Sequence, residues 1–404
     1  MNGTPWDPAA YARRVQCLYF DSARCRSCTL MGTPHAEQVA AKEEHCRGLV
    51  DRPGLHWLDP VIGPESGFRT KAKMVVAGTA ARPTLGILDP DGAGVDLSDC
   101  GLYPPDLRAA FPVLSELVRR ADLVPYDVAR RTGELKYLLV TQSPDGELMV
   151  RFVLRSTELL DRLRAHLPWL RRALPRLVVA SVNLLPEHKA VLEGDREILL
   201  TEAASLLMRV NGITLHLRPQ GFFQTNTEVA AALYRQARAW AGELAPRSVW
   251  DLYCGVGGFA LHCADGDREV TGIETSTEAV EGARRSAREA GLDSVRFHVG
   301  DATVFALGAG IAPELVVVNP PRRGLGADLS GWLETSSVRH LVYSSCNATS
   351  LARDLAAMPS LVPRRAQVLD MFPQTPHYEA LVLLERSGGT GAASATGGPS
   401  HRVG

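Results

Sequence analysis

The fold is decided by the stretch Ser248-Val249-Trp250-Asp251-Leu252-Tyr253-Cys254-Gly255-Val256-Gly257-Gly258-Phe259. Its first five residues have the apolar, β-branched character of a buried strand, and the glycines after them let the backbone turn tightly into a helix. Downstream, the pattern of strand, turn and helix continues, which is typical of a parallel sheet with helical crossovers. We therefore predict an α/β, Rossmann-like domain over residues 216–386.

Polar residues follow the next predicted strands: Glu274 ends Val270–Glu274, Asp301 follows Val295–Val299, and Asn319-Pro320-Pro321 follows Leu315–Val318. Because the carboxyl ends of parallel strands meet at one edge of a sheet, these side chains should surround a ligand there. A carboxylate at Glu274 could accept both hydroxyls of a ribose, and Asp301 could bond an adenine amino group. The sequence therefore predicts a nucleoside-binding edge.

The glycine loop helps to choose the nucleoside. A pyrophosphate cradle has the spacing G-x-G-x-x-G, whereas this loop reads Gly255-Val256-Gly257-Gly258. S-adenosylmethionine has no phosphates, and Asp251 just before the loop suits the charged methionine end of that molecule. We therefore expect S-adenosylmethionine as the cofactor and a methyl transfer as the reaction.

A cysteine is placed to act as a nucleophile. Cys346 follows the predicted strand residues Val342-Tyr343-Ser344-Ser345. A thiolate that adds to C6 of a pyrimidine makes C5 enolate-like, so that C5 can accept a methyl group. A base must then remove the C5 proton, and the candidate is Glu379, which opens the strand-like run Glu379–Val382. The alternative interpretation of Cys346 is a small buried core residue, and that of Glu379 is a surface carboxylate.

Four further cysteines have the spacing of a metal-ligand set. Cys17, Cys25 and Cys28 lie close together, and Cys100 lies far downstream. Four thiolates suit a [4Fe–4S] cluster or a tetrahedral zinc, and the spacing alone does not choose between these two. Cys46 is a rival fourth ligand, although its helical setting favours burial. Cys254 and Cys263, in and after the glycine loop, are interpreted as packing residues.

Composition excludes some classes of protein. The net charge is −1, so a nucleic-acid site must be a local basic surface. Such a surface is predicted from residues near the cysteines, with Phe68 among them to stack on an unpaired base: Arg24, Arg26, Arg69, Lys71 and Lys73. The chain shows no secretory leader and no apolar run long enough to span a bilayer, so we expect a cytoplasmic protein without a membrane partner.

The chain divides by pattern into four parts. We predict an N-terminal cysteine domain over residues 1–105, a central α+β domain over 106–215, the α/β domain over 216–386, and a disordered tail over 387–404 that is rich in Gly, Ala, Ser and Thr. Helices are predicted over His35–Leu49 and Leu114–Arg120, and strands over Lys73–Val76, Leu85–Leu88, Tyr137–Val140 and Leu148–Val153.

The motifs together resemble one family, the RNA uracil-5-methyltransferases. The resemblance covers nearly the whole chain before the tail and rests on the glycine-loop stretch and on Gly221–Asn226, Asn319–Gly324, Ser344–Asn347 and His377–Glu379. It is strongest to the iron–sulfur members that modify 23S rRNA, through Arg24–Cys28, Gly67–Val76 and Arg130–Tyr137.

The resemblance implies a set of roles. Cys346 would be the nucleophile and Glu379 the proton acceptor, while the S-adenosylmethionine contacts would be Gln224, Tyr253, Glu274 and Asn319. Cys17, Cys25, Cys28 and Cys100 would hold a [4Fe–4S] cluster in an N-terminal iron–sulfur domain, and the central domain would bind RNA. The implied partner of a monomeric enzyme is a 23S rRNA hairpin, with uracil 747 as the expected target. Asn319 departs from the Asp of many family members.

Two other functions fit parts of the pattern. A non-catalytic RNA-binding iron–sulfur protein would need neither Cys346 nor Glu379. An amino-group methyltransferase places an aromatic residue after Asn-Pro-Pro to stack on its target base, whereas this chain has Arg322-Arg323, a pair that suits phosphate contacts.

Overall fold

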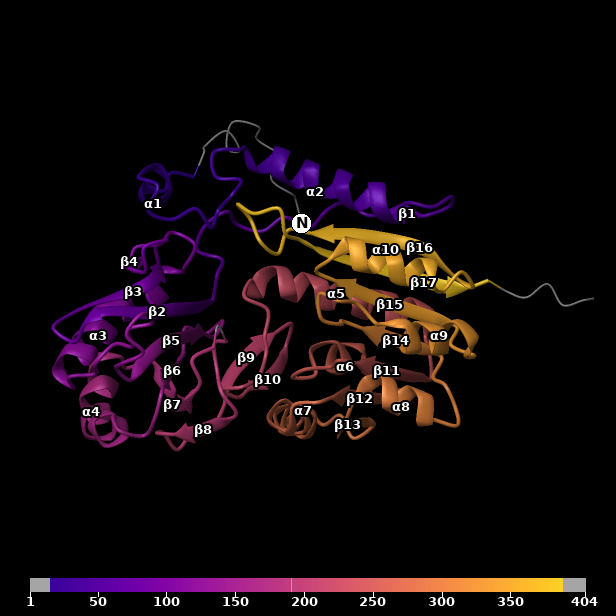
Figure 1. The fold of residues 1–404 in the computed structure, drawn as a ribbon. Coiled ribbons are helices and arrows are strands. Elements are labelled where there is room, and N and C mark those ends of the chain that lie inside the picture. Colours follow the sequence, from indigo (N-terminus) through magenta and orange to yellow (C-terminus); the bar gives the residue numbers. More distant parts are fainter. Residues whose placement is uncertain (1–14, 190, 388–404) are drawn as a thin grey trace, which may run out of the picture.

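The computed structural model describes residues 15–189 and 191–387, and two large sheets organise this part of the chain (Figure 1). The eight-stranded sheet has the order β1-β16-β17-β15-β14-β11-β12-β13. β17 runs antiparallel to both of its neighbours, and the other pairs are parallel. Its strands are β1 (His56–Trp57), β11 (Ser248–Leu252), β12 (Glu269–Glu274), β13 (Val295–Val299), β14 (Leu315–Val318), β15 (His340–Ser345), β16 (Leu361–Leu369) and β17 (Glu379–Arg386).

Helices cover both faces of this sheet. On β14, Leu315 and Val317 pack in the core with α5 to α7, whereas Val316 and Val318 pack in the core with α8 to α10. Successive side chains of a strand point to opposite faces, so a strand buried on both sides reads as a continuous apolar run. The helices are α5 (Thr227–Leu244), α6 (Gly258–Cys263), α7 (Thr277–Glu289), α8 (Ala302–Gly308), α9 (Ala327–Thr335) and α10 (Ala348–Ala356).

The seven-stranded sheet has the order β4-β3-β2-β5-β6-β7-β8 and carries helices on one face. Phe111 and Leu114 of α3 and Leu163 of α4 pack there against Met74 and Phe152 of the sheet. The elements are β2 (Lys71–Thr79), β3 (Arg82–Leu88), β4 (Gly94–Asp96), α3 (Pro105–Arg120), β5 (Leu135–Gln142), β6 (Leu148–Leu154), α4 (Leu160–Ala173), β7 (Leu177–Leu184) and β8 (Arg196–Leu199). A hairpin of β9 (Leu206–Val210) and β10 (Ile213–Leu217) follows.

The N-terminal segment is shared between the two sheets. After α1 (Leu18–Asp21), α2 (His35–Val50) lies against β16 and α10, where Cys46 and Val50 join the core of the eight-stranded sheet (Figure 1). β1 pairs with β16, whereas β2 pairs with β5. The expected boundary at residue 105 therefore does not coincide with a division between sheets.

The predicted helices and strands are confirmed, most of them extended by a few residues at their ends. The predicted tail over 387–404 lies, apart from Ser387, outside the described residues. Across residues 15–189 and 191–387, no helix combines the length and apolar character needed to cross a bilayer.

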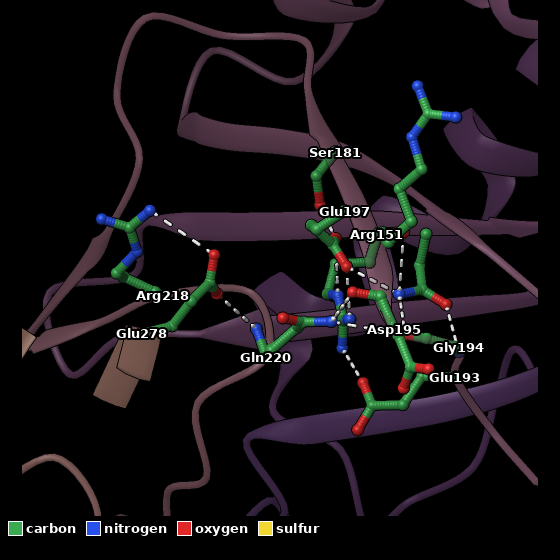
Figure 2. A network of polar contacts seen from close by, with 11 residues as sticks. Arg151, Ser181, Glu193, Gly194, Asp195, Glu197, Arg218, Gln220 and Glu278 are labelled. Carbon is green, nitrogen blue, oxygen red and sulfur yellow. Dashed lines mark hydrogen bonds and ion pairs between the residues drawn. The ribbon is translucent and has the colours of Figure 1, made fainter. Parts of the chain in front are cut away.

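A polar network connects the two sheets (Figure 2). On β6, Arg151 is 2% exposed and forms a bidentate ion pair with Glu197 of β8, at 3.0 and 2.7 Å. The loop before β8 is bonded to Gln220, whose Nε2 donates to the carbonyl oxygens of Gly194 and Asp195 at 3.3 and 3.2 Å. Because the backbone N–H of Gln220 also reaches Glu278 of α7, the network fixes the central sheet to the α/β domain.

Candidate functional site

The glycine loop lies where the strand order of the sheet reverses. β11 has β12 on one side and β14 on the other, so the chain crosses over at this point and leaves a crevice at the carboxyl ends of the strands. Tyr253 has a φ of 69° and Gly257 one of 85°. A Cβ on Gly257 would meet Phe297 at 2.8 Å, so this position needs glycine for both its backbone angle and its packing.

Asp251 and Glu274 approach the loop from β11 and β12. Oε2 of Glu274 accepts from the backbone N–H of Gly255 at 3.1 Å, and Oε1 accepts from Ser276 at 2.9 Å. Oδ2 of the fully buried Asp251 accepts from Ala260 at 2.8 Å, while Oδ1 has no protein partner. Burial, opposed by the Ala260 hydrogen bond and reinforced by the nearby Glu274, raises the pKa of Asp251 to about 7. A bound cationic group would stabilise this carboxylate.

The other predicted cofactor residues lie at neighbouring strand ends. Tyr253 lies beside Thr303 in the first turn of α8, where Oδ1 of Asp301 caps the helix by accepting from Thr303 and Val304. Asn319 follows β14 and is partly exposed. Gln224 lies in the segment before α5, and its side chain is buried.

Cys346 and Glu379 are brought together by strand pairing. β15 and β17 are antiparallel, with Ser345 opposite Ala380, so extending the register by one residue sets Cys346 opposite Glu379. The hydroxyl of the buried Ser344 donates to Oε1 of Glu379. Both predicted chemical groups therefore lie at the carboxyl end of β15, beside the end of β14 that carries Asn319.

Burial controls the electrostatics of this pair. Glu379 is 1% exposed, and burial raises the pKa of its carboxyl to about 7 against the lowering effect of the Ser344 hydrogen bond. The pKa of the Cys346 thiol is raised first by burial and then by the Glu379 charge, while Arg322 lowers it. The carboxyl therefore exchanges its proton near neutral pH, and the thiol beside it holds its proton more strongly than an exposed cysteine does, although Arg322 opposes this shift.

Two residues near the site have features that sequence reasoning did not use. Ser344 is a buried polar residue near the carboxyl end of β15, and such a residue needs a partner, which here is Glu379. Phe222, two residues before Gln224, is 62% exposed. By contrast, Phe68 is 5% exposed, so the expectation that it stacks on an unpaired base is wrong: the ring packs inside the protein.

The four predicted metal-binding cysteines line one cavity of about 800 Å³. Burial, together with the neighbouring charges of Cys100, Cys25 and Cys17, raises the pKa of Cys28 to about 12 against the lowering effect of Arg69. Arg24, Arg69, Lys73 and Arg108 also line this cavity. Within the described residues, no three His, Cys, Asp or Glu side chains form a group that could hold a metal ion.

The remaining cysteines pack in the core. Cys46 is fully buried between α2 and the eight-stranded sheet, and burial raises its pKa to about 12. Because it packs with the α/β domain, it does not line the cavity of the other four. Cys254 and Cys263 are buried in the core on the opposite face, which confirms them as packing residues.

Comparisons with known proteins match this chain to methyltransferases. The family model "Methyltransferase domain" matches residues 249–318, and "tRNA (Uracil-5-)-methyltransferase" matches residues 310–387. The 23S rRNA (uracil(747)-C(5))-methyltransferases RlmC of Escherichia coli (strain K12) and of Shigella boydii serotype 4 (strain Sb227) are each 50% identical to the chain over 372 residues. Each match covers 92% of this chain and 99% of the relative.

A solved structure shares the fold. The tRNA (uracil-54, C5)-methyltransferase of Pyrococcus abyssi, in complex with S-adenosyl-L-homocysteine, superposes with a TM-score of 0.73 at 23% identity. The match covers 88% of this chain and 85% of that chain.

The raised pKa of Glu379 predicts a pH-dependent gain in stability for Glu379→Gln. Burial favours the protonated carboxyl. The wild-type native state therefore loses stability as the pH rises from 4.5, the ordinary pKa of a glutamate, to about 7, the pKa of Glu379 in the folded protein. The glutamine still accepts from Ser344 and carries no charge. Urea unfolding should show the variant more stable by up to roughly 3 kcal/mol at about pH 8, with the difference vanishing near pH 4.

Glu385→Gln is the matched control, because this carboxylate lies exposed on the same strand. It should change the free energy of unfolding by less than about 0.5 kcal/mol at either pH. A Glu379→Gln protein no more stable than the wild type at high pH would show that the native carboxylate is not desolvated.

Proposed function

The chain belongs to the RNA uracil-5-methyltransferase family, and from this premise we propose that it methylates C5 of uracil 747 in 23S rRNA with S-adenosylmethionine as methyl donor. The family follows from 50% identity over 92% of the chain to curated 23S rRNA (uracil(747)-C(5))-methyltransferases. The α/β, Rossmann-like fold of S-adenosylmethionine-dependent methyltransferases, predicted from the sequence, is confirmed.

The observation that supports the proposal is the register of β15 on β17, which pairs Ser345 with Ala380 and, extended by one residue, would set Cys346 opposite Glu379. The Cys346 thiolate adds to C6 of the uracil, and C5 then attacks the methyl group of S-adenosylmethionine. The Glu379 carboxylate accepts the C5 proton, the C5–C6 double bond re-forms, and the thiolate leaves. The base must leave its stack to reach Cys346, which costs a few kcal/mol.

The cofactor contacts are part of the proposal. Gln224, Tyr253, Glu274 and Asn319 would bind S-adenosylmethionine across the crevice beside the glycine loop. The unpaired Oδ1 of the buried Asp251 supports a ligand that carries positive charge at this end of the crevice. An amide at Asn319 can donate to and accept from a ligand, where the carboxylate of many relatives only accepts.

We also propose a [4Fe–4S] cluster on Cys17, Cys25, Cys28 and Cys100. The observation that supports it is that the four thiols line one cavity, and the choice of a cluster over zinc follows the family resemblance. The cations around the cavity would balance the negative charge of thiolate ligands. The cluster would hold together a loop-rich N-terminal segment, and we assign it no redox step.

The RNA contacts extend the proposal beyond the pocket. Exposed Arg24, Arg26 and Lys73 near the cysteine cavity suit the phosphates of a 23S rRNA hairpin, and the exposed Phe222 suits stacking on an unpaired base. Arg322-Arg323, after Asn319, suit phosphates beside the target. A monomeric, cytoplasmic enzyme whose central part binds RNA is consistent with these contacts.

The two alternative functions lose support at the same site. A protein that only binds RNA has no need for a buried carboxylate opposite a cysteine. An amino-group methyltransferase needs no nucleophile, and Arg322 replaces its stacking residue.

Glu379→Gln should trap the enzyme on its RNA. With no acceptor for the C5 proton, the methylated intermediate stays attached through Cys346. Denaturing electrophoresis with unmodified 23S rRNA transcript should then show a protein–RNA band, which the double variant Cys346→Ala/Glu379→Gln should lack. Release of methylated RNA at the wild-type rate would count against Glu379 as the acceptor.

Protein purified without oxygen should be brown and contain about four irons per chain. Cys28→Ser should lose this iron because it removes a cavity ligand, while Cys46→Ser, which changes a core cysteine, should keep it. A colourless preparation that holds one zinc ion per chain would show that these cysteines bind zinc and not an iron–sulfur cluster.

A further inference from the structure

Glu379, the proposed proton acceptor, directly follows a long hairpin loop. β16 and β17 form a hairpin whose last pair is Leu369 opposite Glu379, so the loop spans residues 370–378. Hairpin loops usually have about 2–5 residues, and a longer one needs contacts of its own to hold a single conformation. The position of Glu379 therefore depends on what holds this loop.

The first anchor is a buried ion pair with α2. Asp370, at the start of the loop, is fully buried. Its Oδ1 lies 2.5 Å from Nζ of Lys42, and its Oδ2 lies 2.6 Å from Nε2 of His35. Lys42 also donates to the carbonyl oxygen of Phe372 at 3.1 Å, so one ammonium group holds two points of the loop. Such a pair resists separation because each charge would be left unpaired in the interior.

The second anchor is a reciprocal pair of glutamines. Gln374, with a φ of 67°, donates its backbone N–H to Oε1 of Gln38 at 2.9 Å and accepts from Nε2 of Gln38 at 3.0 Å. Its carbonyl oxygen accepts from Leu30, two residues after Cys28, at 3.0 Å. Helix α2 therefore fixes a backbone conformation that glutamine rarely adopts on its own.

A third contact lies next to the acceptor itself. The hydroxyl of Tyr378 lies 2.7 Å from Nδ1 of His45 on the same helix. All three anchors come from α2, which Figure 1 shows lying along the β16 side of the sheet. The helix thus holds the start, the middle and the end of the loop that precedes Glu379.

We propose that α2 is the positioning element for proton removal, and that Lys42 and Gln38 are its positioning residues. The inference rests on the proposed function, in which the Glu379 carboxylate takes the C5 proton, the C–H electron pair forms the C5–C6 double bond, and the bond from C6 to the Cys346 sulfur breaks. Nucleophilic attack and methyl transfer use Cys346, which directly follows β15 and lies outside the loop. Loosening the loop therefore slows the last step selectively.

The test compares Lys42→Met and Gln38→Leu with Glu43→Gln in the full-length protein. Glu43 is the control because it pairs with Arg47 on α2 and does not contact the loop. With 23S rRNA transcript and methyl-labelled S-adenosylmethionine, each of the first two variants should lose at least about tenfold in turnover, while labelled protein–RNA adduct accumulates under denaturing conditions. Affinity for S-adenosylmethionine should stay within about twofold of the wild-type value, and Glu43→Gln should match the wild type throughout.

A purely structural role for α2 gives a different result. If turnover and labelled adduct fall in parallel, or if neither changes, the positioning role is overturned. Gln38→Leu removes no charge and keeps the test available if Lys42→Met fails to fold. Failure of the proposed function is recognised separately, because Glu379→Gln would then give no labelled adduct. If Glu379→Gln does give the adduct and the α2 variants do not, only the positioning role is overturned.

Discussion

The antiparallel pairing of β17 with β15 is the constraint on which the rest of the structure depends. A purely parallel sheet would bring the carboxyl ends of strands together, which suits cofactor binding, but Glu379 lies at the amino end of its strand. Inserting β17 in the opposite direction sets that amino end beside the carboxyl end of β15, where Cys346 follows. One reversed strand thus adds a carboxylate to an edge that already holds a glycine loop and a thiol.

The burial of carboxyl groups near this edge has energetic consequences. Two carboxyl groups near this edge, Asp251 and Glu379, are fully or almost fully buried, and burial raises the pKa of each to about 7. A desolvated carboxylate is a stronger base than an exposed one, and ionising it in the interior costs stability. Packing on both faces of the sheet, together with the buried Lys42–Asp370 pair, holds the surrounding backbone in place. The site gains reactivity at the expense of local stability.

The sequence predicts local features better than distant pairings. Apolar runs such as Leu315–Val318 predict strands that are buried on both faces. The chemistry of C5 methylation requires a nucleophile and a base, and this requirement points to a cysteine and a carboxylate. The split of the N-terminal segment between two sheets was not predictable, because His56 pairs with Arg365 across more than half of the chain. Likewise, the Lys42–Asp370 contact joins residues 328 positions apart, and no local pattern marks either residue as a partner of the other. The basic residues near Phe68 in the sequence suggested an exposed ring that could stack on a base. The tertiary structure buries this ring, and no local pattern shows that burial.

The central claim is that the Cys346 sulfur bonds to C6 of the uracil while C5 receives the methyl group. It is tested most directly with RNA that carries 5-fluorouridine at the target, because Glu379 cannot remove fluorine as it removes a proton. After incubation with S-adenosylmethionine and proteolysis, mass spectrometry should find the methylated fluoropyrimidine nucleotide on the peptide that contains Cys346. A nucleotide attached to any other residue, or methylated RNA without any attached peptide, would contradict the account.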